Sequence, residues 1–430
     1  MLDIKLFREK PELIIESEKK RGHDIKIASK VIELDKQVRV LIKDVEELKH
    51  ERNVVTEEIN SLKKAGKPTA NKIKQMGQVA DNIKHRDLEI NELLKQRDTL
   101  RMQVGNILEP DVPMGKDDFD NVPIKHVGKK PTFKFKFKDH IELGEALDLF
   151  EFETAAKISG ARFVYFKNEA AILDLALQKF AVDYLTKQKF QIIWPPMMLN
   201  RGTLAGGVNL SEFEDTIYKI QDEDLYLIGT SEHPLIALKK DKVLSEEELP
   251  IRLGGISACF RKEAGAHGRD TKGIFRVHQF NKIEQVIYCK PEDSPKYFKE
   301  LQLNSEKMFS ALGIPFRVIN TCSGSLGNKQ AIMYDIEAWM PGQNNKEGAY
   351  REVTSCSNCK DYQAITLNTK FLNKKTGEKE YVHMLNNTAI ATPRAIVAIL
   401  ENFQQKDGSV KIPKILWPYT GFKVIKPKKR

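Results

Sequence analysis

The fold is decided by the stretch Cys259-Phe-Arg-Lys-Glu-Ala-Gly-Ala-His-Gly-Arg-Asp-Thr-Lys-Gly273, which runs on into Ile274-Phe-Arg-Val-His-Gln-Phe-Asn-Lys-Ile-Glu284. This pattern predicts two strands joined by a long, charged loop rich in glycine. A core strand would carry none of these charges, and an amphipathic edge hairpin, the alternative, rarely sets a phenylalanine between them. Because side chains two positions apart share one face of a strand, the return strand predicts a floor for a ligand with phosphates, a flat ring and an ammonium group. That face carries Arg276, His278, Phe280, Lys282 and Glu284.

Length and composition indicate a globular protein. The chain has 430 residues, of which 41% are hydrophobic and 30% are charged, and these values are typical of two or three soluble domains. No apolar run approaches the roughly 18 residues that a membrane helix needs, and the first residues lack the apolar region of a secretory signal. Five cysteines, an odd number, favour a reducing compartment. We therefore expect a cytoplasmic protein with no membrane partner.

The net charge of +10 suggests a polyanionic partner, but the charge is unevenly distributed. Residues 1–110 hold 23 Lys and Arg against 20 Asp and Glu, so this stretch is nearly balanced. Residues 125–138 contain six lysines and no acid, and residues 421–430 contain five basic residues and no acid. Both segments could contact phosphates, or they could be a solvated linker and a solvated tail.

Two periodic segments fill most of the first 110 residues. Hydrophobic side chains recur at spacings of three and four between residues 27 and 64, and again from about residue 70 to residue 107. Gly66 and Pro68 interrupt the pattern. Two helices of similar length around a tight turn predict an antiparallel hairpin that projects by roughly 55 Å, with a dimerisation coiled coil as the alternative. The seam positions are Val31, Leu34, Val38, Leu41, Val45, Leu48, Arg52 (the one polar position of the first ten), Val55, Ile59 and Leu62, then Ile73, Met76, Val79, Ile83, Ile90, Leu93, Leu100 and Val104.

The rest of the chain has a different organisation. Residues 111–140 are rich in Pro, Gly and Lys and predict a linker. Within it, Thr132-Phe-Lys-Phe-Lys-Phe-Lys138 favours a strand with one apolar face over a set of aromatic stacking positions for nucleic acid. From residue 141 onward helices and strands mix without regular βαβ alternation, so we expect an α+β fold. An amphipathic helix at 168–189 leads into a short strand at 190–194 and two prolines.

The segment Cys259–Glu284 resembles motif 2 of the class II aminoacyl-tRNA synthetases, and the form Gly268-Arg-Asp-Thr-Lys-Gly-Ile-Phe-Arg-Val-His-Gln-Phe280 is similar to that of the seryl-tRNA synthetases. The resemblance extends from the first residue to about Asn402. Residues 168–196 resemble motif 1, which builds the dimer interface in that family, and His383–Asn402 resembles motif 3, a strand that runs into an apolar helix.

The resemblance implies three parts. A tRNA-binding domain at 1–110 carries the coiled-coil hairpin, at about 27–107, and that arm grips the long variable arm of tRNA(Ser). A linker follows at 111–140. A class II catalytic domain at 141–430, built on a mixed, mainly antiparallel sheet flanked by helices, ends in a short basic tail. The family is also expected to form a homodimer.

The implied reaction is that of a serine–tRNA ligase. The carboxylate of L-serine attacks the α-phosphate of ATP, and the seryl group then passes from seryl-adenylate to the 3′ end of tRNA(Ser), with tRNA(Sec) as a further substrate that the family permits. Such chemistry needs positioning and charge neutralisation rather than a protein nucleophile. The resemblance assigns catalysis to Arg261, Arg394 and Glu352, and Mg²⁺ to Glu352 and Ser355 with the ATP phosphates. The implied ATP contacts are Arg261, Lys262, Glu263, Arg276, Val277, Phe280, Glu352, Val353, Thr354, Ser355 and Arg394.

Recognition of serine is a separate problem. A site that hydrogen-bonds the hydroxyl can reject alanine, because its own polar groups would be left unpaired. Thr230-Ser-Glu232 resembles the family's Thr-x-Glu serine loop, although by itself it is also a helix-capping pattern. Glu284 would take the hydroxyl. The implied serine-binding set is Thr230, Ser231, Glu232, Arg261, Glu284, Asn386 and Thr388.

Two features need comment. Cys356 and Cys359 suggest zinc, but no further pair of ligands stands at a suitable spacing, so we expect no structural zinc. Ile365 and Thr366 stand where the family usually has two arginines, so the activity could be weaker or the tRNA unusual.

The charged loop between the motif 2 strands is expected to meet the tRNA acceptor end through Gly265, Gly268, Arg269, Asp270 and Lys272. Two alternatives to an active synthetase remain. One is a catalytically divergent paralogue, silent as an enzyme. The other is a ligase that charges a carrier protein, and such enzymes lack the long N-terminal arm.

Overall fold

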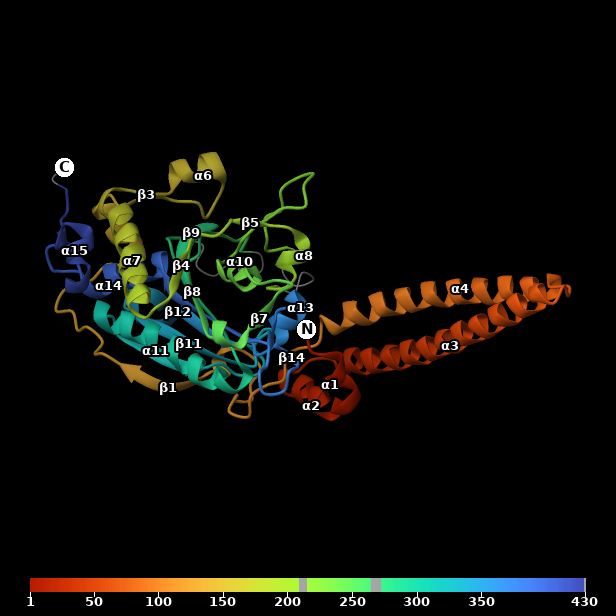
Figure 1. Cartoon of the computed structure of the whole chain (residues 1–430). Helices are drawn as coiled ribbons and strands as arrows, with labels where there is room; N and C mark the ends of the chain where they lie inside the picture. The colour runs from red at the N-terminus through yellow and green to blue at the C-terminus, as the bar shows by residue number, and fades with distance from the viewer. Residues whose placement is uncertain (209–214, 264–271, 429–430) are drawn as a thin grey trace. The chain divides into compact units, whose positions relative to one another are not determined.

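The computed structural model describes residues 1–208, 215–263 and 272–428. The chain divides into two compact units, Met1–Ile107 and Leu108–Arg430. Each unit has its own hydrophobic core, and each is described separately (Figure 1). Within the described residues, no helix combines the length and the apolar character needed to cross a bilayer.

The first unit is entirely helical. It contains α1 (Ile4–Glu9), α2 (Pro11–Arg21), α3 (Ile25–Lys64) and α4 (Ala70–Arg101). Asp24 caps α3 by accepting a hydrogen bond from the backbone of Lys26, as expected for an N-cap carboxylate. Gly66, with φ of 68°, turns the chain between the two long helices.

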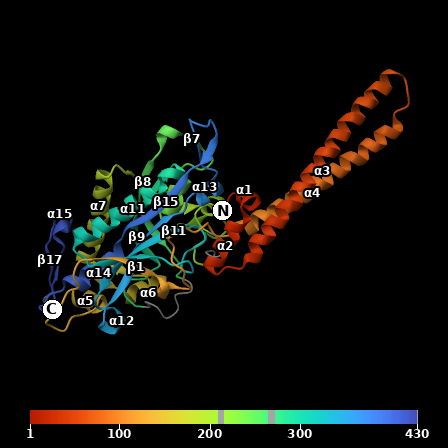
Figure 2. The ribbon, with the colours of Figure 1, turned by 90° about the horizontal axis from the view of Figure 1, so that it is seen from below.

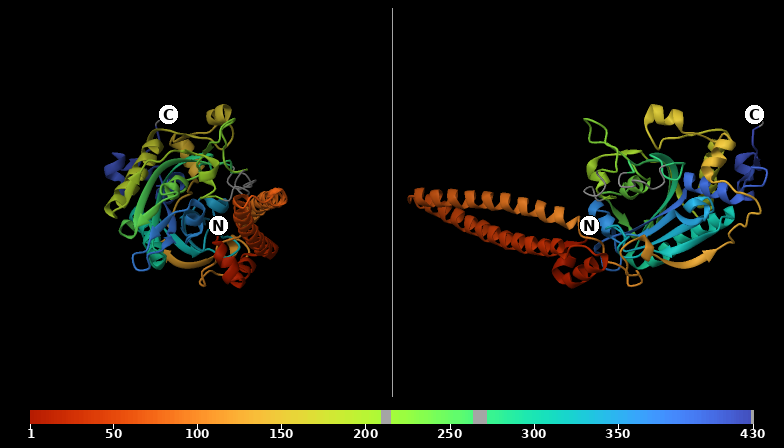
Figure 3. Two further views of the ribbon diagram at one scale, coloured as in Figure 1. Left: turned by 45° about the vertical axis from the view of Figure 1, so that its right-hand side comes forward. Right: turned by 180° about the vertical axis from the view of Figure 1, so that it is seen from behind.

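The hairpin α3–α4 is held by one apolar seam. The two helices run antiparallel and side by side along their length (Figure 3). Near the turn Val55 and Ile59 of α3 remain buried, but Ile73 of α4 is 50% exposed and is not part of the seam, contrary to the prediction. The buried seam residues are Val38, Leu41 and Val45 of α3 with Val79, Ile83 and Ile90 of α4.

The second helix of the hairpin is shorter than predicted. It ends at Arg101 rather than near residue 107. The chain turns away because its backbone bonds to α2 instead. The amide of Gly105 donates to Glu18 Oε1, and the carbonyl of Asn106 accepts from Arg21 Nη2 at 2.9 Å.

A buried ion cluster joins the short helices to the base of the hairpin. The Asp35 carboxylate of α3 forms ion pairs with three arginines: Arg8 Nε at 2.8 Å, Arg39 Nε at 3.1 Å and Arg97 Nη1 at 2.9 Å. Burial alone would raise the pKa of Asp35, but the arginines hold it below its usual value. One carboxylate therefore links α1, α3 and α4.

The second unit is built on an eight-stranded sheet with the order β1-β10-β11-β12-β15-β9-β8-β4. All neighbouring pairs are antiparallel except β4–β8, so the sheet is mixed and mainly antiparallel, as predicted. Figure 2 shows β8, β9, β11 and β15 within this sheet. Its strands are β1 (Val122–Val127), β4 (Gln191–Ile193), β8 (Ile251–Phe260), β9 (Gln279–Cys289), β10 (Phe316–Asn320), β11 (Ile332–Met340), β12 (Ala349–Asn358) and β15 (His383–Ala391).

The long helices cover one face of the sheet, while α10 and α13 cover only part of the other face and leave it open at the site. Inward side chains such as Ile283 and Ile287 of β9 form the main core with these helices. The principal helices are α5 (His140–Ala146), α7 (Asn168–Lys187), α11 (Ser294–Leu312) and α14 (Thr392–Phe403). Shorter helices are α6 (Glu153–Ser159), α8 (Arg201–Leu204), α10 (Glu232–Ala237), α12 (Gln343–Lys346), α13 (Tyr362–Leu367) and α15 (Trp417–Thr420).

Small sheets and single turns complete the unit. The minor strands are β2 (Phe150–Glu151) with β3 (Tyr165–Phe166), β5 (Met198–Leu199) with β6 (Tyr226–Leu227), β7 (Val243–Ser245) with β13 (Lys370–Leu372) and β14 (Lys379–Tyr381), and β16 (Val410–Lys411) with β17 (Val424–Ile425). The 3₁₀ turns are η1 (Asp118–Asp120), η2 (Glu246–Glu248), η3 (Pro291–Asp293) and η4 (Lys414–Leu416).

Three local predictions need correction. The segment 132–138 is not a strand, although its phenylalanines are partly buried and its lysines exposed; the rings of Phe133 and Phe137 pack together at 5.1 Å instead of lying on a sheet. The segment 111–140, predicted as a linker, contains β1, which pairs with β10 at the sheet edge. The return strand of motif 2 begins at Gln279, because residues 272–278 bend.

Candidate active site

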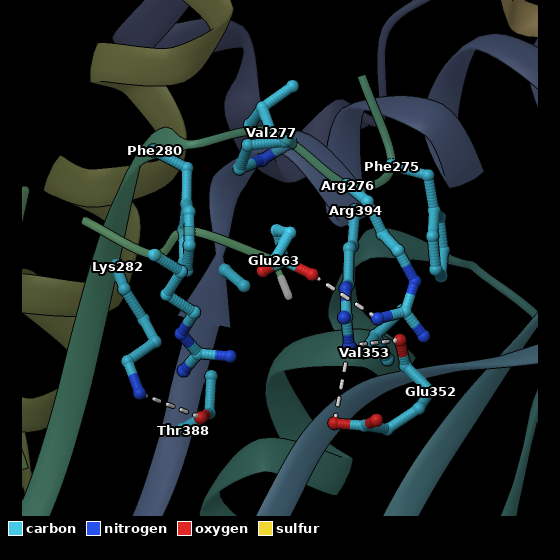
Figure 4. A pocket seen from close by; sticks show the side chains of 13 residues that line it. Glu263, Phe275, Arg276, Val277, Phe280, Lys282, Glu352, Val353, Thr388 and Arg394 are labelled. Atoms are coloured by element: carbon cyan, nitrogen blue, oxygen red, sulfur yellow. Dashed lines mark hydrogen bonds and ion pairs between the residues drawn. The ribbon is translucent and has the colours of Figure 1, made fainter. Parts of the chain in front are cut away.

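A pocket opens on the uncovered face where β8, β9, β12 and the start of α14 meet. Figure 4 shows its side chains converging from these elements. Three arginines and two glutamates line it together with aromatic and small apolar residues. The lining residues are Arg261, Glu263, Phe275, Arg276, Val277, Phe280, Lys282, Glu352, Val353, Thr388, Ala391, Pro393 and Arg394.

Arg261 is held at one side of this pocket. It follows β8 directly, its Nε donates to the carbonyl of Gly229 at 3.1 Å, and its guanidinium lies 5.4 Å from the ring centre of Phe280. Its backbone amide donates to His278, whose ring packs on Phe163 rather than lining the pocket. His278 is therefore part of the support for Arg261 and not of the floor that the alternation predicted.

Glu263 and Arg276 form the rim. Their side chains pair at 3.3 Å between Oε2 and Nη1. Glu263 has φ of 51°, a left-handed conformation that is uncommon outside glycine and often found at functional sites. Together the two residues place a carboxylate and a guanidinium at the mouth of the pocket (Figure 4).

Arg394 faces Arg261 across the pocket. It lies in the first turn of α14, where the helix dipole disfavours a cation. Its Nη1 donates to the carbonyl of Glu352 at 3.0 Å and lies 3.2 Å from the Glu352 carboxylate. The ring of Phe275 lies 4.8 Å from the Arg394 guanidinium and 4.2 Å from that of Arg351. These contacts hold the Arg394 guanidinium in the pocket lining, paired with the Glu352 carboxylate.

A β-bulge in β12 arranges the acidic side of the pocket. In the register of the two strands, Glu352 lies opposite Glu337 of β11 and Ser355 lies opposite Asp335. Between these two positions β12 has one residue more than β11. Residues three apart in a regular strand point to opposite faces, but the bulge brings Glu352 and Ser355 to the same face. Burial, and then the negative charge of Glu352, raise the pKa of Asp335 well above its usual value.

These oxygen donors fit Mg²⁺. The ion prefers carboxylate, hydroxyl, phosphate and water ligands and usually takes only one or two carboxylates from a protein. Asp335 Oδ1 is buried and accepts no hydrogen bond from the described residues, so this oxygen remains available as an acceptor beside Glu352 and Ser355. Among the same residues, no three His, Cys, Asp or Glu side chains are grouped to hold a metal by themselves.

A second, deeper group of charges lies on the same face. Thr388 of β15 stands opposite Glu284 of β9 and donates to Glu284 Oε2 at 3.3 Å. Lys282 forms an ion pair with the same carboxylate. Burial, opposed by Lys282 and assisted by the charge of Glu232, raises the pKa of Glu284.

Glu232 is the second buried carboxylate. It begins α10, whose N-cap residue Ser231 makes no side-chain capping bond; the backbone amide of Glu232 donates to Thr230 Oγ1 at 3.1 Å instead. Its Oε1 accepts from Lys329 Nζ at 2.5 Å and from Gln363 Nε2 at 2.9 Å. Burial would raise the pKa of Glu232, but Lys329 foremost lowers it to about 2.

The close approach of α10 to the sheet depends on a glycine. A Cβ atom on Gly255 of β8 would lie 2.7 Å from both Leu235 Cδ1 and Ser231 Oγ. The Ser231 hydroxyl donates to the carbonyl of Gly255 at 3.4 Å and is fully buried. The side chain of Ser231, a member of the predicted serine-binding set, therefore packs against β8.

Not every predicted contact lies in the pocket. Lys262 directs its Nζ toward Tyr218, 6.0 Å from the ring centre. Thr354 is buried outside the lining set, and Asn386 donates to Cys359 Sγ at 3.6 Å. Of the predicted acceptor-end loop, Gly265, Gly268, Arg269 and Asp270 lie outside the described residues.

The sequence assigned Lys282 only to the predicted floor and gave no role to several other residues of the site: Phe275, Ala391, Pro393, Lys329 and Gln363. The alternation of side chains along the strand placed Lys282 on the correct face. Phe275, which lines the same pocket, lay within the quoted motif. Lys329 and Gln363 had no local signal, because they meet Glu232 from 97 and 131 residues away in the chain.

The two unusual features of the sequence are structural in this unit. Cys356 and Cys359 are buried, free thiols, and burial raises the pKa of both, that of Cys359 to about 12. Ile365 of α13 is buried, and Thr366 Oγ1 donates to the carbonyl of Tyr362 at 3.3 Å.

Comparison with known proteins decides the family. Residues 1–108 match the model of the seryl-tRNA synthetase N-terminal domain, and residues 216–403 match that of the class II tRNA synthetase core domain for G, H, P, S and T. A serine–tRNA ligase of Pyrococcus horikoshii is 46% identical over 99% of this chain and 98% of its own length. The chain belongs to the seryl-tRNA synthetase family.

Solved structures of this family agree. The crystal structure of a seryl-tRNA synthetase from Pyrococcus horikoshii complexed with ATP has a TM-score of 0.94 and 45% identity, and all of both chains is covered. A cytoplasmic serine–tRNA ligase from Naegleria fowleri in complex with AMP has a TM-score of 0.90 and 36% identity, over 100% of this chain and 99% of that one. The predicted fold and family are thereby confirmed.

Proposed function

We propose that this chain is a serine–tRNA ligase that forms seryl-adenylate from L-serine and ATP and then charges tRNA(Ser). One observation carries the proposal: a pocket with two opposed arginines and an aromatic wall adjoins a pair of buried carboxylates. Arg261 and Phe280 stand on one side, Arg394 on the other, and Glu284 is joined to the pocket lining through Thr388 and Lys282.

ATP would occupy the open pocket in a bent conformation. Its adenine would stack on Phe280, with Glu263 and the backbone of Val277 at its edge, while Arg276 and Arg394 take the β- and γ-phosphates. Arg261 would hold the α-phosphate. A planar guanidinium that is always charged suits both the ground-state phosphate and the charge that grows on it.

Bond formation requires in-line geometry more than proton transfer. The serine carboxylate forms a bond to the α-phosphorus while the bond to the β-phosphate bridging oxygen breaks and pyrophosphate leaves. Glu352 and Ser355 would hold Mg²⁺, which when bound supplies neutralisation of phosphate charge. Glu352 also keeps Arg394 in place through the two contacts described above.

Serine would lie in the deeper part of the site. Its ammonium would meet Thr230 and Glu232, and its hydroxyl would meet Glu284, with Thr388 and Asn386 completing the walls. The two carboxylates are buried, so an amino acid that lacks the hydroxyl leaves an acceptor without a donor, which is costly.

The proposal extends to macromolecular partners. The hairpin α3–α4 would grip the long variable arm of tRNA(Ser), and tRNA(Sec) is a further substrate. Motif 1, now seen as α7 and β4, would form the interface of a homodimer; Leu175 and Trp194 in this region are 66% and 72% exposed.

Serine-dependent exchange between ATP and pyrophosphate tests the adenylation step. The chain should catalyse it, and Arg261→Ala should reduce it by about 10²- to 10³-fold, as for loss of one preorganised transition-state donor. Arg252→Ala is the matched control, because Arg252 lies on the same strand but pairs with Glu300 outside the pocket; exchange should stay within threefold.

Three results would contradict the proposal. Absence of exchange with any amino acid would favour the silent paralogue. Faster exchange with threonine or glycine would refute the serine pocket. Charging of a carrier protein in place of tRNA(Ser) would favour the other ligase class.

A further inference from the structure

The Glu232 carboxylate has one bonded and one open oxygen. Oε1 accepts from Lys329 and Gln363, and no described residue donates to Oε2. Glu232 is only 6% exposed, so a group that bonds to Oε2 would have to lie in the site beside it. An open acceptor on a buried carboxylate is expensive unless a ligand supplies the donor.

Lys329 is tied to three segments at once. It lies in the connection between β10 and β11, pairs with Glu232 at the start of α10, and donates to the carbonyl of Gly207 next to α8 at 3.4 Å. Glu232 therefore meets its cation through the tertiary fold, not through its own helix. A lysine on a flexible stem, fixed at its tip by two acceptors, can hold a carboxylate in one position.

We propose that Lys329 is a positioning residue of the amino-acid pocket: it keeps Glu232 ionised and turns its free oxygen toward the substrate ammonium. This inference rests on the proposed assignment of Glu232 to the serine site. Lys329 bonds to Oε1 of the carboxylate, so the ammonium would bond to Oε2 and would not displace the lysine.

Among the charged groups around Glu232, Lys329 is the cation that keeps this carboxylate ionised. From α10 itself His233 is buried and has its pKa lowered to about 3 by burial, so it stays neutral and cannot replace a cation. Glu284 of β9 repels a second negative charge, while Lys282 is already paired with Glu284. Arg261 is bonded to Gly229, and Cys359 beyond Lys329 is a neutral thiol.

Removing the lysine charge would leave Glu232 buried without a cation bonded to it, since Lys282 pairs with Glu284 and Arg261 bonds to the carbonyl of Gly229. A carboxyl in such a place takes up a proton near neutral pH. A protonated Glu232 no longer attracts the serine ammonium, so the loss should appear in the KM for serine, and raising the pH should restore binding.

The test is the KM for each substrate in serine-dependent exchange, measured from pH 6 to pH 9. We expect Lys329→Met to raise the KM for serine at least 30-fold at pH 7, with less effect at pH 9, and to change the KM for ATP less than threefold. Lys329→Arg should recover most of the loss. Lys290→Met is the matched control, since it breaks the Lys290–Glu246 pair outside the site.

Two outcomes overturn the inference: a serine KM within twofold of wild type in Lys329→Met, or an equal rise in both KM values at every pH, which marks a merely structural role. A second measurement separates this inference from the proposed function. If wild-type protein shows no serine-dependent exchange, the proposed function and the pocket role of Lys329 both fail. Non-additive unfolding free energies of Lys329→Met and Glu232→Gln would then show that the pair is structural only.

Discussion

The two units of this molecule differ in where they place their charged side chains. The arm, residues 1–107, keeps most of its charges in solvent and buries a single hydrophobic seam, although charges are also buried at the Asp35 cluster and at Glu18 and Arg21. The catalytic unit buries carboxylates and lysines beside each other at Glu232, Lys329, Glu284 and Lys282. Buried charges are costly without partners, so they mark the place where a ligand is expected to complete them.

The largest effect should separate the two units functionally. Replacing residues 50–81 by a short glycine-containing turn shortens the hairpin but retains Val45, Leu48, Ile83 and Ile90 of the lower seam. We expect charging of tRNA(Ser) to fall by about 10³-fold or more, which corresponds to ~4 kcal/mol of lost binding. Serine-dependent exchange should be unchanged. Charging at the wild-type rate would refute the role of the arm.

The next effect should show the cost of a broken buried pair in the catalytic unit. Glu232→Gln leaves Lys329 without its carboxylate and should lower the free energy of unfolding at pH 7 by about 3 kcal/mol. The pKa of Glu232 is lowered from 4.5 to about 2, so its contribution is present above pH 4.5 and is lost as the pH falls toward 2.

The stability difference between wild type and Glu232→Gln should therefore shrink as the pH is lowered from 5 to 2. Denaturant unfolding at several pH values measures it. Glu284→Gln is the informative comparison, because the pKa of Glu284 is raised and its ionised form is the penalised one. This variant should gain stability relative to wild type as the pH rises. A pH-independent difference for Glu232→Gln would contradict the assigned pair.

The smallest effect should come from the arm. Val45→Ala removes two methyl groups from the seam and should destabilise the hairpin by about 1–2 kcal/mol. Amides of α3 and α4 should then exchange hydrogen roughly 5- to 30-fold faster, while those of β9 and β15 keep their protection. Val40→Ala on the same helix is the control, since Val40 is 55% exposed. Equal effects of the two variants would contradict the single-seam description.

The same contrast explains what the sequence could predict. The hydrophobic spacing predicted the first long helix as 27–64, and the structure has Ile25–Lys64, because a helix with one seam is specified by local periodicity. The end of α4 was wrong since Gly105 and Asn106 bond to α2, a partner more than eighty residues away. Local patterns carry no information about such contacts.

Within the site the limits are similar. Alternation placed Phe280, Lys282 and Glu284 on one face of β9, as the structure has them. It failed at His278, where the chain bends before the strand begins. The family resemblance supplied Glu352 and Ser355 as a pair, but only the bulge in β12 explains why residues three apart can share a face. The binding roles of these residues remain predictions until the exchange assays are done.

The position of Glu232 at the amino-acid end of the site depends on Gly255. Gly255 touches no substrate in the proposed arrangement, yet the missing side chain lets the helix that begins with Glu232 rest directly on β8. A single added methyl group there would act as a spacer, lifting the carboxylate away from Lys329 and loosening the grip on a small amino acid while leaving the nucleotide side intact. In the proposed arrangement, the close contact between α10 and β8 at Gly255 would therefore contribute to discrimination between amino acids.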